Sequence, residues 1–274
     1  MMTVAPTQGQ RRAKGIGRSL AHVWSDCREG RERVTQGWLG SLVEFADSLE
    51  IAEPGWRKIR LPDQGGYEGW VREDDLVPVL FATNKVLPLA VIAQPFIEIE
   101  RGGFLQDRGW LPMGARFPLL DRKEGFVALQ MPQGTPCWIP EEAIRAWPSD
   151  VQTGEEALLL AAKFLGRPYL WGGMGWPGID CSGLVFIAFW TLGIMLPRDA
   201  KDQWALLEAV DEANARPGDL IFFSRRPPLV DHVGLVAGKG VFLHASSSLG
   251  GVAYSDWREQ RWRERLFGFR RSPV

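Results

Sequence analysis

A glycine-containing loop runs straight into an apolar stretch at Asp180-Cys181-Ser182-Gly183. Residues 169–173 before this point read Tyr-Leu-Trp-Gly-Gly, and every residue from 184 to 190 after it is apolar. Asp is a favoured helix N-cap residue, so we expect a helix that begins after Asp180 and holds Cys181 in its first turn. The loop gives the thiol access, and the free N–H groups and the dipole of the helix start favour its thiolate form. This pattern indicates a reactive cysteine rather than an inert core residue.

The pattern of apolar residues changes near residue 151. From residue 21 onwards, short apolar runs alternate with turn residues such as Pro-Asp-Gln-Gly-Gly at 62–66, which is typical of small β-barrels. After residue 151, helical segments come first and a run of strands follows, which indicates an α+β domain. The predicted fold is therefore multidomain, with small all-β barrels followed by an α+β domain. The expected divisions are an N-terminal arm at 1–20, a barrel at 21–78, a degenerate second barrel at 79–150 and the α+β domain at 151–274.

Charge and hydropathy argue against several classes of protein. The chain has 32 basic and 33 acidic residues, so its formal net charge of −1 gives no electrostatic reason to expect nucleic acid or an anionic membrane as a partner. No stretch approaches the ~18 uninterrupted apolar residues of a membrane-spanning helix. The first residues are partly basic but lack the apolar segment of a secretory signal. We therefore expect a cytoplasmic protein, with export to the cell envelope as the alternative.

The cysteines and histidines point to nucleophilic catalysis. The three cysteines are far apart and odd in number, which argues against a disulfide scaffold and leaves Cys181 as a candidate nucleophile with histidine as its base. His232 and His244 flank a compact loop, Gly238-Lys239-Gly240, and a three-residue hairpin loop there places His244 opposite Gly234. His232 is then a diagonal neighbour on the same sheet face. One imidazole can deprotonate Cys181 while the other fixes its tautomer.

Other interpretations of these residues remain open at this level. Cys181, His232 and His244 could bind zinc, although a structural zinc site uses four ligands, or the cysteine could be unreactive and both histidines structural. Residues 173–178 also match Gly-x-Gly-x-x-Gly, but the dinucleotide-binding fingerprint needs a strand before it and a helix opening within it. Here a helix precedes the motif and Pro177 lies inside it. We therefore expect neither a metal ion nor an organic cofactor.

Two groups of motifs resemble known families. In the first barrel, Gly-Tyr-Glu-Gly-Trp-Val at 66–71 resembles bacterial SH3 (SH3b) domains. Residues 151–274 resemble the NlpC/P60 family of papain-like cysteine peptidases, through motifs that include Asp-Cys-Ser-Gly-Leu-Val at 180–185, Leu-Pro-Arg-Asp-Ala at 196–200, Asp-His-Val-Gly at 231–234 and Leu-His-Ala-Ser at 243–246. The resemblance implies roles for four residues: Cys181 as nucleophile, His232 as general base, His244 as the residue that orients it, and Tyr169 as an oxyanion contributor through its hydroxyl.

The combination of SH3b barrels with this domain is similar, more narrowly, to the γ-D-glutamyl-L-diamino acid endopeptidases of murein peptide recycling (dipeptidyl-peptidase VI type). These enzymes cleave stem peptides of the form L-Ala-γ-D-Glu-diamino acid that have a free amino terminus. The resemblance implies that the first SH3b domain caps one end of the cleft and contributes Tyr67, and that Asp180 and Ser182 bind the substrate amino terminus. It also implies an acid from the first barrel, for which Glu32 is the candidate and Glu29 the alternative.

The function expected from the resemblance is that of a cysteine endopeptidase that hydrolyses the γ-D-glutamyl–diamino acid bond of peptidoglycan stem peptides. One alternative is a secreted hydrolase of polymeric peptidoglycan, and another is a non-catalytic wall-binding protein with a vestigial peptidase domain. The role of Arg198 is also open, since it is either a substrate-binding residue or a structural ion-pair arginine.

Overall fold

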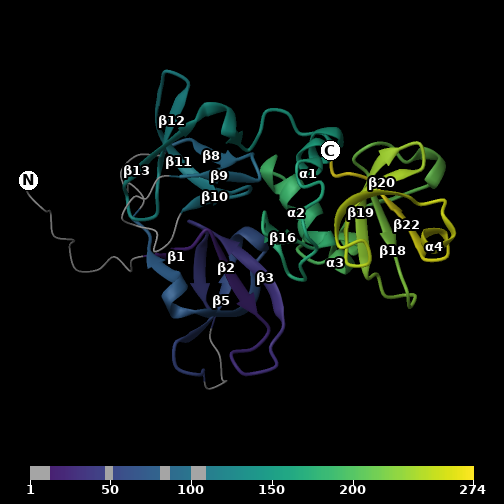
Figure 1. Ribbon diagram of the computed structural model, residues 1–274, viewed down its shortest axis with the longest axis horizontal. Coiled ribbons are helices and arrows are strands. Elements are labelled where there is room, and N and C mark those ends of the chain that lie inside the picture. The colour runs from purple at the N-terminus through teal and green to yellow at the C-terminus, as the bar shows by residue number, and fades with distance from the viewer. Residues whose placement is uncertain (1–12, 47–51, 81–86, 100–108) are drawn as a thin grey trace, which may run out of the picture.

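The computed structural model describes residues 13–46, 52–80, 87–99 and 109–274, which form three units around a central helix pair (Figure 1). Two strand-rich units lie on one side of helices α1 (Gly154–Ala162) and α2 (Cys181–Thr191), and a six-stranded sheet lies on the other. In these ranges, no helix has both the length and the apolar character needed to cross a membrane. The predicted multidomain class, with β units followed by a domain of helices and sheet, is confirmed.

The first unit is a curled seven-stranded sheet in the order β3-β2-β6-β5-β4-β1-β7. Its core follows the alternation of a half-buried strand: Ala21 and Val23 are buried, and His22 between them is exposed. The predicted arm at 1–20 is wrong at its end, because residues 14–16 form a strand that pairs with β4 and β7 and buries Ile16. A strand this short shows no readable alternation in the sequence. The strands are β1 (Lys14–Ile16), β2 (Leu20–Trp24), β3 (Arg33–Trp38), β4 (Leu42–Phe45), β5 (Trp56–Leu61), β6 (Tyr67–Arg72) and β7 (Leu76–Pro78).

The second unit is a five-stranded sheet in the order β13-β12-β11-β8-β14, with β9 and β10 as a separate pair. Its buried side chains, such as Phe117 and Leu129, belong to one continuous apolar core that also includes the helices of the last domain. The second unit is therefore packed onto that domain rather than tethered to it. Its strands are β8 (Leu89–Ile92), β9 (Phe96–Glu98), β10 (Trp110–Pro112), β11 (Arg116–Lys123), β12 (Phe126–Gln130), β13 (Pro136–Pro140) and β14 (Ile144–Trp147).

The last domain begins with α1, which Thr153 caps, because its hydroxyl oxygen accepts the N–H of Glu156 at 3.1 Å. Residues 173–178, which match the dinucleotide fingerprint, form a small hairpin instead of a strand-to-helix turn. The large sheet is antiparallel in the order β17-β22-β18-β19-β20-β21. The remaining elements are β15 (Met174–Gly175), β16 (Gly178–Ile179), α3 (Ala200–Leu206), β17 (Ala209–Val210), β18 (Leu220–Phe223), β19 (His232–Gly238), β20 (Val241–Ser246), β21 (Gly251–Asp256), α4 (Gln260–Arg263) and β22 (Leu266–Arg270).

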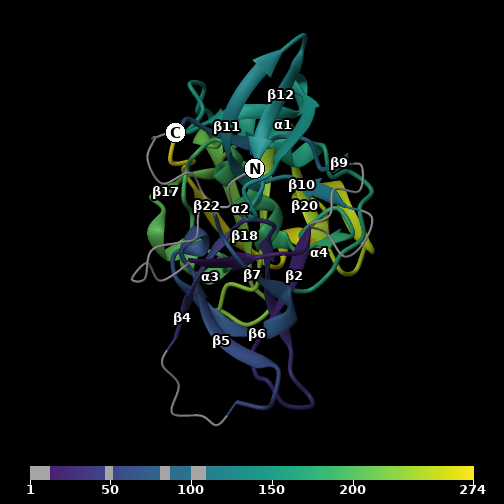
Figure 2. The ribbon, with the colours of Figure 1, turned by 90° about the vertical axis from the view of Figure 1, so that its left-hand side faces the viewer.

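Helix α2 is buried on all sides, as expected for a helix that is apolar all round. It packs against β19 and β20 on one face, and on another it contacts Trp38 of the first unit, whose ring stacks on Trp190 with centroids 5.9 Å apart. Trp190 Nε1 also donates to the carbonyl oxygen of Gly114 in the second unit at 2.8 Å. Figure 2 shows the two strand-rich units above and below this helix. Contacts with all three units therefore fix the helix whose first residue is Cys181.

Candidate active site

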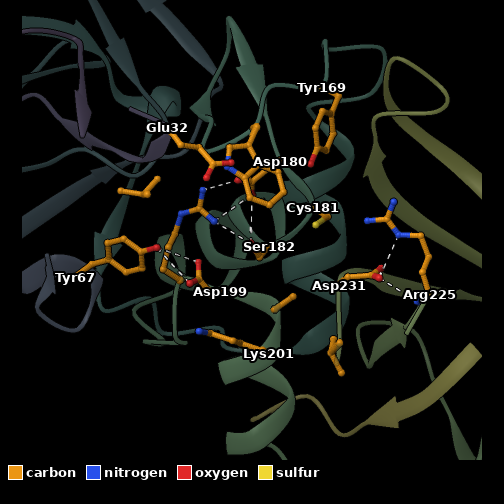
Figure 3. Close-up of a pocket in the computed structure, with 15 residues that line it drawn as sticks. Glu32, Tyr67, Tyr169, Asp180, Cys181, Ser182, Asp199, Lys201, Arg225 and Asp231 are labelled. Atoms are coloured by element: carbon orange, nitrogen blue, oxygen red, sulfur yellow. Dashed lines mark hydrogen bonds and ion pairs between the residues drawn. The ribbon is translucent and has the colours of Figure 1, made fainter. Parts of the chain in front are cut away.

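Cys181 is the first residue of α2 and lines a cavity of about 290 Å³ (Figure 3). The preceding Asp180 is the N-cap, with extended backbone angles of φ −95° and ψ 177°, and its Oδ1 accepts the N–H of Gly183 at 2.6 Å. Gly183 has to be glycine, because the carbonyl oxygen of Gly173 lies 2.5 Å from the position that its Cβ would take. The predicted capped helix with Cys181 in its first turn is confirmed.

The surroundings of Cys181 favour the neutral thiol in the free protein. Burial raises the pKa of the thiol to about 12, and the neighbouring Asp180 carboxylate adds to the rise. The backbone N–H groups of Val233 and Ser182 act in the opposite direction without compensating for burial. The expectation of an accessible thiolate produced by the helix start alone is therefore wrong. Attack by this sulfur requires a nearby proton acceptor.

The two histidines face each other from neighbouring strands, as predicted. His232 begins β19, His244 lies in β20, and His232 Nε2 is 2.7 Å from His244 Nδ1. The loop between them is shorter than predicted, because Gly238 pairs with Val241 and leaves a two-residue turn, Lys239-Gly240, with positive φ at both positions. A bulge between residues 236 and 238 takes up the extra residue and keeps both imidazoles on one face.

Ser255 extends this chain of side chains. His244 Nε2 lies 3.0 Å from Ser255 Oγ on β21, and both residues are buried. For His232 Nδ1 to accept a proton, His232 Nε2–H must donate to His244 Nδ1, and His244 Nε2–H must then donate to Ser255. Burial lowers the pKa of His232 to about 4 and that of His244 to about 2, so both rings are neutral at pH 7. Sequence reasoning missed Ser255, because only the pairing of β20 with β21 brings it to His244.

Cys181 and His232 line adjoining parts of one cleft. His232 lines a second cavity of about 340 Å³ beside the one that Cys181 lines. The residues that line both cavities are Tyr169, Trp171, Arg225 and Asp231. The N–H of Val233, which directly follows His232, bonds to the Cys181 thiol and so brings the start of β19 beside the start of α2. The hydroxyl of Tyr169 points toward Cys181 (Figure 3).

The geometry does not favour the zinc alternative. His232 and His244 direct ring nitrogens at each other rather than at a common third position. Within the described ranges, no group of three or more His, Cys, Asp and Glu side chains is placed to hold a metal ion.

One end of the first cavity, called the acidic end below, has two carboxylates, and Lys201 is also among the residues that line the cavity. Glu32 and Tyr67 of the first unit and Asp199 before α3 line it, whereas the alternative candidate, Glu29, does not (Figure 3). The Tyr67 hydroxyl donates to Asp199, with O···O distances of 3.2 and 3.4 Å. Asp199 is the N-cap residue of α3, yet its side chain makes no capping bond, and burial raises its pKa. Among the described residues, neither Glu32 nor Asp199 forms an ion pair with a lysine or arginine, and sequence reasoning had missed Asp199.

Arg198 forms a buried ion pair with Asp180. Its Nη2 donates to Asp180 Oδ2 at 2.6 Å, and its Nη1 donates to Asp180 Oδ1 at 3.1 Å and to Ser182 Oγ at 2.8 Å. Its Nε donates to Thr35 Oγ1 of the first unit at 3.0 Å. Only 2% of Arg198 is exposed. The structure therefore shows Arg198 in an ion pair, and Arg198, Asp180 and Ser182 all line the cavity with much of their hydrogen-bonding capacity already used.

The first unit is held against the site by direct hydrogen bonds to the loop before α2. Arg33 Nε donates to the carbonyl oxygen of Trp171 at 2.9 Å, and Gln36 Oε1 accepts the N–H of Met174 at 2.8 Å. Gly172 has a positive φ of 68°, and a Cβ there would meet the Arg33 carbonyl oxygen at 2.6 Å. This close approach explains how Glu32, next to Arg33, reaches the cavity.

A cysteine at a helix start, a histidine pair on the adjoining sheet and a cleft closed by a β-barrel define the papain-like class of thiol hydrolase sites. Within this class, residues 166–271 match the model of the NlpC/P60 family, and the last domain of this chain is an NlpC/P60 domain. It follows two strand-rich units, which is consistent with the predicted arrangement of SH3b-like barrels before the peptidase domain.

Two curated relatives and one solved structure support this placement. The chain is 29% identical to the gamma-D-glutamyl-L-lysine dipeptidyl-peptidase of Bacillus subtilis (strain 168) over 227 residues, which is 77% of this chain and 73% of that protein. It is 38% identical to the bifunctional muramidase/DL-endopeptidase CwlT of the same strain over 120 residues, 43% of this chain and only 36% of that protein. The fold matches the crystal structure of an NlpC/P60 family protein from Bacillus cereus ATCC 10987 with a TM-score of 0.83, at 23% identity, covering 94% of this chain and 99% of that one.

Proposed function

We propose that this protein is a cysteine endopeptidase that cleaves the γ-D-glutamyl–diamino acid bond of peptidoglycan stem peptides with a free amino terminus. The observation that carries the proposal is the cleft itself. Cys181 and His232 lie along it, and it ends at two carboxylates, Glu32 and Asp199, that form no ion-pair contact with a lysine or arginine in the described part of the chain. The Bacillus subtilis relative that matches over 227 residues is named for action on a γ-D-glutamyl-L-lysine bond, which supports the same bond here.

The reaction begins with two neutral groups. As the sulfur of Cys181 attacks the γ-carbonyl carbon of D-glutamate, its proton passes to His232 Nδ1, and His244 accepts a hydrogen bond from His232 Nε2–H throughout. The oxyanion is stabilised by the Tyr169 hydroxyl, which stays protonated because burial raises its pKa. His232 then protonates the leaving amine as the C–N bond breaks and a thioester forms. Water, deprotonated by the same histidine, hydrolyses the thioester and releases the acid.

The low pKa of His244 suits it to this role. A protonated His244 would carry a hydrogen on Nδ1 and could not accept the hydrogen bond from His232. Burial and the proximity of His232 lower its pKa to about 2, so His244 remains an acceptor when His232 becomes an imidazolium. His244 is thereby a positioning residue that stabilises the cationic state of the base.

The acidic end of the cavity supports selection for a free amino terminus. A substrate ammonium placed there could pair directly with Glu32 and Asp199, whereas Arg198 and Lys201 act on Asp199 without forming an ion-pair contact. Charge-assisted hydrogen bonds are stronger than neutral ones. The first unit also supplies the wall of this end, with Glu32, Val34 and Tyr67. A peptide chain that continued past the amino terminus would meet that wall, so the cleft favours short peptides over polymeric peptidoglycan. Short stem peptides are the substrates of a cytoplasmic recycling enzyme, and we propose that role.

The proposal is tested with L-Ala-γ-D-Glu-L-Lys and the same tripeptide acetylated at its amino terminus, with products identified by mass spectrometry. We expect cleavage of the free peptide and a loss of about 10- to 100-fold in kcat/KM on acetylation, the range for a hydrogen-bonded charge. Cys181→Ala should abolish cleavage. Cys137→Ala, which replaces a cysteine of the second unit, is the control and should leave cleavage intact. Efficient cleavage of intact sacculi but not of the tripeptide would favour the wall-hydrolase alternative, and no cleavage of either would favour the non-catalytic one.

A further inference from the structure

The cavity on the His232 side has a charge opposite to that of the acidic end. Its charged residues are Arg225, Asp231 and Arg265, and His232 is neutral at pH 7. Arg225 and Asp231 are paired, with Arg225 Nε 3.2 Å from Asp231 Oδ2. Arg265 makes no ion pair with a carboxylate anywhere in the ranges that the structure describes. The cavity therefore carries one uncompensated positive charge.

Hydroxyl groups and an aromatic wall complete this cavity. Ser246 and Ser248 line it and are hydrogen-bonded to each other at 3.0 Å, so one of the two O–H groups remains free to donate to a bound acceptor. Trp262 stacks on His232 with ring centroids 5.7 Å apart and an interplanar angle of 19°, which forms an apolar side. A cation with an adjacent hydroxyl donor is complementary to a carboxylate, and the aromatic wall is complementary to an aliphatic side chain.

The location identifies the part of the substrate that this cavity would receive. The acidic end lies beyond Cys181 on one side, and the Arg265 cavity extends past His232 on the other. The residue that leaves is bonded to the amine that His232 protonates, so it lies on the His232 side. In a stem tripeptide this leaving diamino acid has a free α-carboxylate. In a longer stem, that carboxylate is an amide and carries no charge.

We infer that the His232-side cavity binds the free carboxylate of the leaving diamino acid, and that Arg265 is the residue that selects it. This inference rests on the proposed function and adds to it a second specificity: the protein prefers peptides that end at the diamino acid. The cleft is then bipolar, with carboxylates that bind the substrate ammonium at one end and an arginine that binds its carboxylate at the other.

The experiment compares L-Ala-γ-D-Glu-L-Lys with its C-terminal carboxamide, two substrates that differ only in this charge. We expect the wild-type protein to cleave the acid with a kcat/KM at least about fivefold above that of the amide, the upper range for a solvent-exposed charge pair. Arg265→Gln should bring this ratio close to one by lowering kcat/KM for the acid alone, and Arg265→Lys should retain part of it. Arg258→Gln is the control, because Arg258 is an exposed arginine of the same domain that does not line the cavity.

The pH profile separates selection from a general electrostatic effect on the base. Arg265 also lowers the pKa of His232. In Arg265→Gln the acid limb of the kcat/KM profile should therefore move to higher pH, by the same amount for both substrates. An unchanged acid-to-amide ratio in Arg265→Gln, with both peptides still cleaved, would overturn the inference and leave the proposed function intact. Failure of the wild-type protein to cleave either peptide would remove both.

Discussion

Replacing Arg198 by methionine isolates the contribution of the buried ion pair beside the nucleophile. Methionine has a similar length but no charge and no donors, so Asp180 loses both bonds to the guanidinium. The Asp180 carboxylate keeps the N–H donors of Gly183 and Gly172, at 2.6 and 2.9 Å. Breaking a buried pair by removing one partner costs about 3–5 kcal/mol. Because two donors remain, we expect the lower end, a loss of about 3 kcal/mol in the free energy of unfolding.

The loss is measured as a shift in the thermal unfolding midpoint at pH 7. For a protein of this size, 1 kcal/mol corresponds to roughly 2–4 °C, so the midpoint should fall by about 6–12 °C. The double variant Arg198→Met with Asp180→Asn removes the uncompensated charge and should recover more than half of the shift. Arg258→Met provides the control, since its pair with Asp256 is exposed and should contribute less than about 1 kcal/mol.

The size of the effect should also depend on which side chain replaces Arg198. Arg198→Lys should lose less stability than Arg198→Met in the same measurement, because a lysine keeps the positive charge although it cannot reproduce the two-pronged contact. A midpoint shift below 2 °C, or a double variant no more stable than Arg198→Met, would refute the view that Arg198 compensates a buried charge.

Two further predictions concern the histidines. Ser255→Ala should lower kcat about tenfold with little change in KM, because His244 loses the acceptor that fixes its tautomer. Ser255→Thr should restore most of the rate. Equal kcat values for the wild-type protein and both variants would contradict this role of Ser255. The pKa values of His232 and His244 are lowered on folding, so the unfolded chain binds more protons below about pH 6.5, and the free energy of unfolding should fall as the pH drops from 6.5 toward 4. Urea denaturation at pH 7, 5.5 and 4.5 measures this slope, which should be smaller in His244→Asn.

The parts of the site that the sequence could predict are those set by local rules. Asp180 before an apolar run is a capping signal that needs no knowledge of the tertiary fold, and the structure has that cap. His232 and His244 face each other because side chains on a strand alternate between its two faces and the turn between the strands is compact. This holds even though the turn is one residue shorter than expected. A bulge between residues 236 and 238 compensates for the shorter turn, so the two imidazoles still lie on one face of the sheet.

The parts that could not be predicted depend on contacts between distant segments. Asp199 reads as an ordinary helix cap, and only the approach of Tyr67 from the first unit shows that its carboxylate faces the cavity. The protonation state of Cys181 could not be predicted from the sequence for the same reason. The helix start is visible in the sequence, but the burial that outweighs it comes from strand β19 and the units packed around α2.

The contacts of Arg198 explain why the first unit and the nucleophile behave as one structure. Gln64 accepts the hydroxyl of Thr35 at 2.7 Å, Thr35 accepts from Arg198, and Arg198 holds the carboxylate that caps the helix of Cys181. Every group in this chain is buried, so a shift of the barrel would leave a polar or charged group without its partner. The same barrel supplies Glu32 to the acidic end of the cleft. The unit that lines the acidic end is thus coupled through buried hydrogen bonds to the helix that begins at Cys181, so a displacement of one would disturb the other.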